Sequence, residues 1–164
     1  LKAWKEFCPL KVVDVVSSAA MCEATLAAFE HADMAILCAA VADFTPCTRA
    51  DKKIKKQPGQ DGMVVELKTT TDIAATLGAS KQAHQRLVGF ALETHDEQAN
   101  ALRKLQSKNL DMIVLNSLQD QGAGFGVDTN KVTLLFADGT KKDLPLLLKQ
   151  EVADVIVESI LQLI

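Results

Sequence analysis

Polar side chains stand where three predicted strands end. The apolar segment 34–42 runs into Asp43, segment 86–92 runs into Glu93 and Thr94, and segment 112–115 runs into Asn116. Each of these alone is better explained as the passage from a strand to a loop. The carboxyl ends of parallel strands meet at one edge of a sheet, where open α/β sheets bind their ligands. The three together therefore favour a binding cleft at that edge.

Two lysines on a predicted helix could bind an anionic ligand there. Lys104 and Lys108 are four residues apart within segment 95–108, so they share one face of the helix. Lysine is a good point-charge partner for phosphate. A pair of solvated surface lysines is the alternative explanation.

A second group of lysines surrounds Ile54, at positions 52, 53, 55 and 56. It lies in segment 45–69, which contains Pro46, Pro58 and Gly59 and is predicted to leave the sheet as a flap. A mobile basic flap can close over a polyphosphate and exclude water, although a lysine run can also be a solvated face. In an extended segment the four lysines would not all face one ligand.

Other kinds of site have little support. Residues 122–126 have the glycine spacing of a dinucleotide loop, but they lead into a strand-like segment rather than a helix. No Walker A sequence is present, and the three histidines, His31, His84 and His95, have no recognisable Ser or Cys nucleophile. The four cysteines lack metal-ligand spacing. Cys22 and Cys38 are expected to be buried, reduced thiols, which favours a cytoplasmic location. No apolar stretch has the ~20 residues of a membrane span, and a signal peptide is not expected.

The elements that must position these residues alternate between strands and helices. Strands are predicted at 11–16, 34–42, 63–69, 86–92, 111–115, 131–137 and 141–144, and helices at 21–31, 72–77, 95–108 and 149–164. This order indicates an α/β fold with a mostly parallel sheet, and the turn signal Asp138-Gly139 adds an antiparallel edge hairpin. The 164 residues suffice for one domain, and the net charge of −3 gives no support for nucleic acid or an anionic membrane as partner.

Several segments, taken in order, resemble bacterial phosphopantothenoylcysteine synthetase, often the C-terminal half of a bifunctional protein. They are AAVADF at 39–44, KIKK at 53–56, TDI at 71–73, GFALET at 89–94, Lys104, KNLDMI at 108–113, Asn116 and GFGVDTN at 124–130. The resemblance runs from about Val12 to the end. It implies a single nucleotide-binding domain over 1–164, a three-layer Rossmann-like fold, and a protruding flap at 45–69 that also serves as a dimerisation arm.

The resemblance implies a ligase of coenzyme A biosynthesis. In its first step the carboxylate of 4′-phosphopantothenate attacks the α-phosphate of CTP, giving an acyl-cytidylate and pyrophosphate. The amine of cysteine then attacks the acyl carbon and releases CMP. Mg²⁺ and a homodimer are implied as well, whereas FMN would belong to a decarboxylase half that is absent here. The residues alone do not separate CTP from ATP and do not identify metal ligands.

The resemblance also implies the residues of the nucleotide site. They are Leu37, Cys38, Ala39, Asp43, Lys53, Thr71, Asp72, Ile73, Ala74, Phe90, Lys104 and Lys108. Lys53 is the implied catalytic residue, which would reach the phosphates or the reacting carboxylate from the flap. Residues 71–74 would meet the nucleotide at a helix start, where backbone N–H groups favour anions, and Phe90 would pack against the base or sugar.

The chain also departs from this family. Thr70-Thr71-Asp72-Ile73 stands where Asn-Pro-Asp-Ile is common, so the aspartate is kept but the proline is not. The family's opening strand, its glycine-rich turn and an asparagine of the acyl-cytidylate step are expected upstream of Leu1, so we expect this chain alone to be weak or inactive. The alternatives are a NAD(P)-binding oxidoreductase fragment and a non-catalytic interaction domain without nucleotide affinity.

Overall fold

The computed structural model describes residues 10–117 and 126–163, which form two compact units. Residues 10–27 and 41–71 make the first, which we call the arm unit. Residues 28–40, 72–117 and 126–163 make the second, which we call the sheet unit. The two units are described separately.

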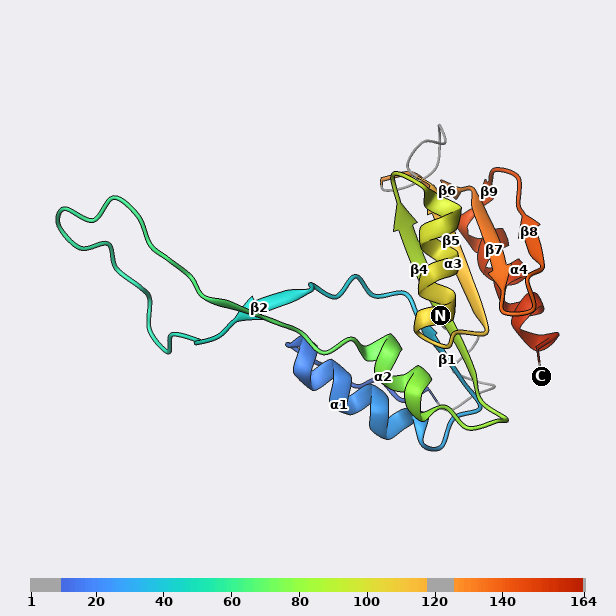
Figure 1. The fold of residues 1–164 in the computed structure, drawn as a ribbon, viewed down its shortest axis with the longest axis horizontal. Coiled ribbons are helices and arrows are strands. Elements are labelled where there is room, and N and C mark those ends of the chain that lie inside the picture. Colours follow the sequence, from blue (N-terminus) through green and yellow to red (C-terminus); the bar gives the residue numbers. More distant parts are fainter. Residues whose placement is uncertain (1–9, 118–125, 164) are drawn as a thin grey trace. The chain divides into compact units, whose positions relative to one another are not determined.

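The sheet unit is built on five strands in the order β1-β4-β5-β7-β8 (Figure 1). Their bounds are β1 Met34–Leu37, β4 Arg86–Glu93, β5 Met112–Ser117, β7 Val132–Phe136 and β8 Lys141–Asp143. Strands β1, β4 and β5 are parallel, whereas β7 and β8 pair antiparallel as an edge hairpin. Gly139, in the turn of the hairpin, has φ +88°, a conformation that side chains rarely adopt. The predicted mostly parallel sheet with an antiparallel edge is confirmed.

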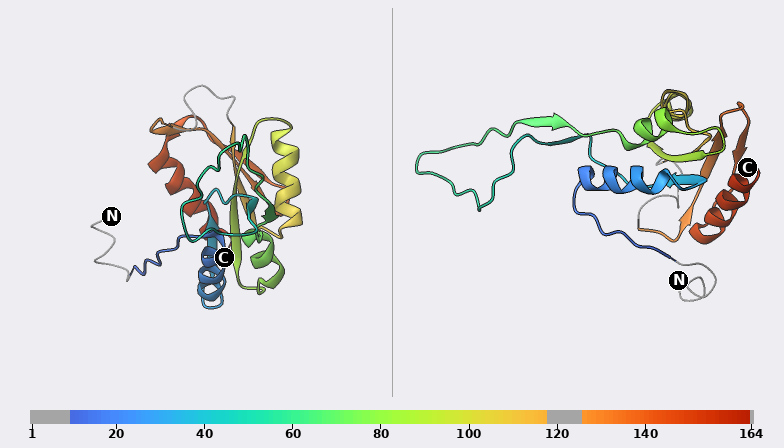
Figure 2. Two further views of the ribbon diagram at one scale, coloured as in Figure 1. Left: turned by 90° about the vertical axis from the view of Figure 1, so that its left-hand side faces the viewer. Right: turned by 90° about the horizontal axis from the view of Figure 1, so that it is seen from below.

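Helices cover both faces of this sheet, which gives three layers (Figure 2). Helices α2 (Ile73–Ser80) and α3 (Glu97–Ser107) contact one face, with Leu77 and Leu105 buried beneath them. Helix α4 (Lys149–Leu161) covers the other face. Its Val152, Ile156 and Ile160 recur at helical spacing and pack into a core with side chains of β4, β5 and β7.

The central strands are buried on both sides, as their continuous apolar sequences predict. The side chains with no more than 1% exposure there are Leu87, Val88, Met112, Ile113, Val114, Leu134 and Leu135. Burying a side chain of this kind contributes about 2 kcal/mol, so these strands form a stiff frame for the residues at their ends.

Strand β1 is shorter than predicted. It ends at Leu37 rather than at Ala42, and residues 38–43 form no regular structure. Among the described strands β1 pairs only with β4, and Ile36 is 42% exposed. Leu37 pairs with Gly89, and the apolar residues after Leu37 have no paired residue on β4. The strand therefore ends before the apolar sequence does. Cys22 is buried as predicted, but the prediction for Cys38 is wrong, because it lies just beyond this edge and is exposed.

The arm unit begins with a segment whose predicted strand is absent. Residues 11–16 form no strand, and Val16 is fully exposed. Alternating β-branched residues need a paired strand to form this structure, and the described residues provide none here. Helix α1 (Ser18–Phe29) follows and crosses into the sheet unit; the Ser17 hydroxyl caps it by accepting the Ala20 N–H at 3.1 Å.

The flap is present as a long loop closed by a short ladder (Figure 1). Strand β2 (Phe44–Pro46) pairs antiparallel with β3 (Leu67–Thr69). Residues 47–66 between them contain neither helix nor strand, so the predicted strand at 63–69 forms only at its end. All four flap lysines are exposed.

A small antiparallel pair completes the sheet unit. Strand β6 (Thr129–Asn130) pairs with β9 (Leu147–Leu148), which leads directly into α4. The sequence analysis did not predict this pair. Most of the glycine-rich segment 122–126 that precedes it lies outside the described residues.

Candidate functional site

The carboxyl ends of β4 and β5 lie side by side in the sheet unit. Glu93 is in register with Ser117, and Leu92 is in register with Asn116. Two of the three predicted strand-end positions, Glu93 and Asn116, therefore share one edge, which we call the carboxyl edge. Asp43, the third, belongs to the arm unit and lies six residues beyond the end of β1.

Lys104 on α3 reaches the carboxylate at the end of β4. Its Nζ lies 2.6 Å from Oε1 of Glu93, from which it is separated by 11 residues. The Lys104 side chain is 41% exposed, whereas that of Glu93 is only 14% exposed. The carboxylate is thus set into the protein and the ammonium stands toward solvent.

Lys108, which follows the last turn of α3, pairs with Asp72 at 2.9 Å. Asp72 is the N-cap of α2 and accepts the Ala75 N–H at 3.0 Å. Partial burial raises the pKa of Asp72, but the hydrogen bonds from Ala75 and Lys108 outweigh it, so the pKa lies below its ordinary value. The carboxylate is therefore charged at neutral pH, and it occupies the helix start that was predicted for phosphate.

The two lysines and their two carboxylates form a charge-balanced group, which we call the lysine–carboxylate quartet: Glu93, Asp72, Lys104 and Lys108. Each carboxylate comes from a different element, the end of β4 or the start of α2. That the two lysines bind one ligand together stays a prediction. Their pairing means that an incoming phosphate must share the ammonium groups with the carboxylates or displace them.

Phe90 lies on the other face of the sheet from the quartet. It is three residues before Glu93 on β4, and side chains alternate along a strand. Phe90 is half-buried and packs against the core beneath α4. The structure therefore does not place its ring beside Lys104 or Lys108.

The predicted residues of β1 lie next to Phe90 in the sheet. Leu37 is in register with Gly89, the residue before Phe90, and Cys38 and Ala39 follow it as exposed residues. Ile73 and Ala74 form the first turn of α2, next to Asp72. The sheet unit thus holds nine of the twelve predicted residues.

Three predicted residues, Asp43, Lys53 and Thr71, belong to the arm unit. The Asp43 carbonyl accepts the Thr70 N–H at 2.9 Å, which extends the base of the arm, and Lys53 is exposed on the loop. Their approach to a nucleotide stays a prediction.

Asn130 is a neighbour of the carboxyl edge that sequence reasoning missed. Its Nδ2 donates to Oδ1 of Asn116 at 3.0 Å, which joins β6 to the end of β5. The signal was available, because Asn116 and Asn130 both belong to the segments that carried the resemblance. Within residues 10–117 and 126–163, no group of three or more His, Cys, Asp or Glu side chains is arranged to hold a metal ion.

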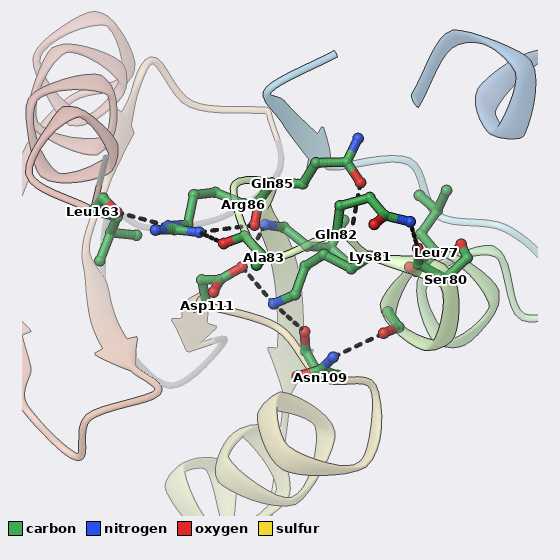
Figure 3. Close-up of polar contacts among 12 residues, drawn as sticks. Leu77, Ser80, Lys81, Gln82, Ala83, Gln85, Arg86, Asn109, Asp111 and Leu163 are labelled. Atoms are coloured by element: carbon green, nitrogen blue, oxygen red, sulfur yellow. Dashed lines mark hydrogen bonds and ion pairs between the residues drawn. The ribbon is translucent and has the colours of Figure 1, made fainter. Parts of the chain in front are cut away.

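The opposite edge of the sheet holds a denser polar network (Figure 3). Lys81 donates to Asp111 Oδ2 at 2.7 Å and to the Asn109 carbonyl at 2.9 Å. The same Asp111 oxygen accepts the Leu87 N–H at 2.7 Å, and Arg86 donates to the Leu163 carbonyl. These contacts join the starts of β4 and β5 to the residue that follows α2 and to the C-terminal residues. We therefore assign them a structural role rather than a functional one.

Comparison with known sequences decides the family. The family described as "DNA/pantothenate metabolism flavoprotein C-terminal domain" matches residues 3–164. The chain belongs to this family. The family predicted from the ordered segments is thereby confirmed.

Similar proteins within this family are longer than the chain. Coenzyme A biosynthesis bifunctional protein CoaBC of Bacillus subtilis is 48% identical over 97% of the chain and 37% of its own length, and that of Escherichia coli K12 is 36% identical over 92% and 37%. A protein of an unknown prokaryotic organism named cysteine/cysteine sulfinic acid decarboxylase is 54% identical over 94% of the chain and 43% of its own length. The chain thus spans less than half of these relatives.

Solved structures share the fold. The crystal structure of the C-terminal domain of CoaBC has a TM-score of 0.73 and 40% identity, and covers 92% of this chain and 66% of that chain. The DNA/pantothenate metabolism flavoprotein from Streptococcus pneumoniae, at 20% identity and a TM-score of 0.70, supports the fold alone. No helix within the described part of the chain is long and apolar enough to cross a membrane.

Proposed function

We propose that this chain is the nucleotide-binding domain of a phosphopantothenate–cysteine ligase of coenzyme A biosynthesis, using CTP and working in the cytoplasm. The observation that carries the proposal is a pair of lysines on one face of α3 in a family-matched domain: Lys104 reaches Glu93 at the end of β4, and Lys108 reaches Asp72 at the start of α2. The 48% identity to a CoaBC protein over nearly the whole chain supports the same reaction.

The proposed chemistry consists of two substitutions. A carboxylate oxygen of 4′-phosphopantothenate attacks the α-phosphorus of CTP, forming the acyl-cytidylate as the bond to pyrophosphate breaks. The amine of cysteine then attacks the acyl carbon, CMP leaves, and the amine loses a proton as the amide forms. Both steps build negative charge on phosphate oxygens, so fixed positive charge and correct positioning accelerate them without a protein nucleophile.

The lysines of the chain match this need. Lys104 at the carboxyl edge and Lys108 beside the start of α2 would bind phosphate oxygens, and Lys53 would add a charge from the arm at the reacting phosphate. A nucleotide lying across the edge would meet these lysines beyond one face of β4, and Phe90 and the backbone of Leu37 to Ala39 beyond the other. This placement accommodates both parts of the predicted site.

Mg²⁺ would contribute charge neutralisation on the triphosphate. It is commonly held by one or two carboxylates together with substrate phosphates. Of the two acidic side chains in the quartet, Asp72 is the more exposed, at 48%. The described residues thus suit an ion that arrives bound to the nucleotide better than one held by a protein cage.

We further propose that the arm forms a homodimer contact. It carries several large apolar side chains in exposed positions: Phe44, Ile54, Met63, Val64, Val65 and Leu67. Exposed apolar groups gathered on one segment mark interaction sites. Replacing Ile54 and Val64 by serine should shift the mass measured by light scattering from dimer to monomer; an unchanged mass would refute the contact.

Decarboxylation of cysteine or cysteine sulfinic acid is a second candidate, favoured by the 54% identical relative of that name. That relative matches over only 43% of its length, and the same part of this chain aligns with the CoaBC proteins. Release of CO₂ from either amino acid by this chain would favour the second candidate.

Calorimetry with CTP, ATP and NADP⁺ in the presence of Mg²⁺ tests the proposal. CTP should bind most tightly, and a longer protein containing this domain should release pyrophosphate when 4′-phosphopantothenate is added. Preferential binding of NADP⁺ would indicate an oxidoreductase fragment. No affinity for any nucleotide would indicate an interaction domain.

A further inference from the structure

The Glu93 carboxylate has a role that the assigned nucleotide-binding residues do not explain. It lies at the end of β4, is only 14% exposed, and contacts the Lys104 ammonium at 2.6 Å. We propose that Glu93 is a positioning residue that holds Lys104 at the carboxyl edge, ready for the phosphates of a polyphosphate ligand. This inference rests on the proposed function and adds a residue to it.

The burial of Glu93 needs an explanation. Placing a carboxylate away from water costs free energy unless a partner compensates for it. Among the described residues, Lys104 is the one partner of this side chain. As a device for stability the pair is weak, because the Lys104 side chain is 41% exposed and such ion pairs contribute little. The contact makes better sense as a means of fixing a long, flexible side chain.

The Lys104 ammonium can donate hydrogen bonds to a ligand while it stays paired with Glu93. A lysine ammonium has three N–H donors, and Lys104 uses one for Glu93. Lys81 shows what a purely structural lysine looks like in this chain, since it is 10% exposed and donates to both Asp111 and Asn109. The exposure and single contact of Lys104 therefore point to a cation prepared for an anion.

The other carboxylate of the quartet is explained differently. Asp72 accepts the Ala75 N–H as the cap of α2, so it would be needed there even without Lys108. Glu93 caps no helix among the described residues. Its contact with Lys104 is therefore the feature that a positioning role must explain.

The direction in which Glu93→Gln changes the affinity for a polyphosphate distinguishes two roles of Glu93. It either positions Lys104 for the ligand or simply competes with the ligand for Lys104. Glu93→Gln removes a negative charge near the anion, so competition predicts tighter binding of a polyphosphate. Positioning predicts weaker binding, by about tenfold, the effect of one charge-assisted hydrogen bond. Glu158→Gln on the exposed side of α4 changes the net charge equally and serves as the control.

A double-mutant cycle with inorganic tripolyphosphate and then CTP tests the inference. Glu93→Gln should weaken both ligands about tenfold in the wild-type background and have no effect in Lys104→Met. The ¹³Cε signal of Lys104 should shift on adding tripolyphosphate to the wild-type chain, and less in Glu93→Gln. Urea unfolding of each variant confirms that it is folded.

The outcomes separate the inference from the proposed function. An equal loss in both backgrounds, an unchanged or higher affinity in Glu93→Gln, or a Lys104 signal insensitive to tripolyphosphate overturns the positioning role. If the cycle holds for tripolyphosphate but CTP binds no better than ATP or NADP⁺, the positioning role stands and the proposed CTP-dependent function fails.

Discussion

The two edges of the parallel sheet use the same residue types in opposite ways. At the amino-terminal edge, Lys81 and Asp111 are 10% and 20% exposed, and both make additional hydrogen bonds to backbone groups. In the lysine–carboxylate quartet, which includes Glu93 at the carboxyl edge, Lys104 and Lys108 are 41% and 28% exposed and each pairs with one carboxylate. The first arrangement uses its hydrogen-bonding capacity to hold the fold together, and the second leaves capacity for a ligand.

The largest expected effect concerns the amino-terminal edge. Asp111→Ala would remove the carboxylate oxygen to which both the mostly buried Lys81 side chain and the Leu87 N–H donate, leaving Lys81 with the Asn109 carbonyl and no opposite charge. Removing one partner of a buried pair costs about 3–5 kcal/mol, so we expect a loss near 3 kcal/mol in the free energy of unfolding by urea. A loss below 1 kcal/mol would contradict the structural role of this edge.

The second prediction concerns the contact that brings α2 close to the end of α3. A Cβ added at Gly78 would lie 1.9 Å from the Lys108 carbonyl oxygen, which is a backbone atom that cannot move alone. Gly78→Ala should therefore destabilise the chain by about 1–3 kcal/mol. Because the shift would also separate Lys108 from Asp72, CTP affinity should fall as well. Unchanged stability together with unchanged affinity would show that this packing is not needed.

The third prediction concerns Lys108 of the quartet. Lys108→Met should weaken CTP binding by about tenfold, as expected for one charge-assisted contact. It should change the free energy of unfolding by about 1 kcal/mol or less, because the pair is partly exposed. Lys142→Met on the exposed edge strand β8 removes the same charge and should leave both quantities unchanged. A large stability loss with unchanged affinity would show that Lys108, like Lys81, has a structural role only.

The smallest expected effect is on the pH dependence of stability. The pKa of Asp72 is lowered in the folded chain, so its charged form stabilises the fold above the unfolded pKa of about 3.9. That stabilisation is lost as pH falls through the folded pKa. Asp72→Asn keeps a capping side chain and should be slightly less stable than wild type at pH 7. The difference should shrink below about pH 4; a constant difference would contradict the assignment.

Much of the sheet unit could be predicted from the sequence, because the secondary structure that each local sequence pattern favours is also the one that its packing in the fold requires. The buried runs of β4 and β5, the helix carrying Lys104 and the hairpin at Asp138-Gly139 all appear where expected. The segment 11–16 and the end of the run 34–42 failed because strand formation depends on a neighbouring strand, which the residues themselves do not reveal.

The site was predictable as a set of residue types and less so as a set of contacts. Lys104 and Lys108 were found from their spacing, but their carboxylate partners lie 11 and 36 residues away in sequence, and only the packing of α2 and α3 brings them together. Phe90 was assigned to the same site, although strand alternation places its ring on the other face of β4 from Glu93. The alternation was readable from the sequence; the position of α3 was not.

Calorimetric titration of CTP with Mg²⁺ into the wild-type chain, Lys104→Met and Lys142→Met tests the central claim most directly. We predict that CTP binds the wild-type and Lys142→Met chains equally and Lys104→Met about tenfold more weakly, with urea unfolding showing that all three are folded. Equal CTP binding by Lys104→Met and the wild-type chain would contradict the claim that the carboxyl edge is the nucleotide site.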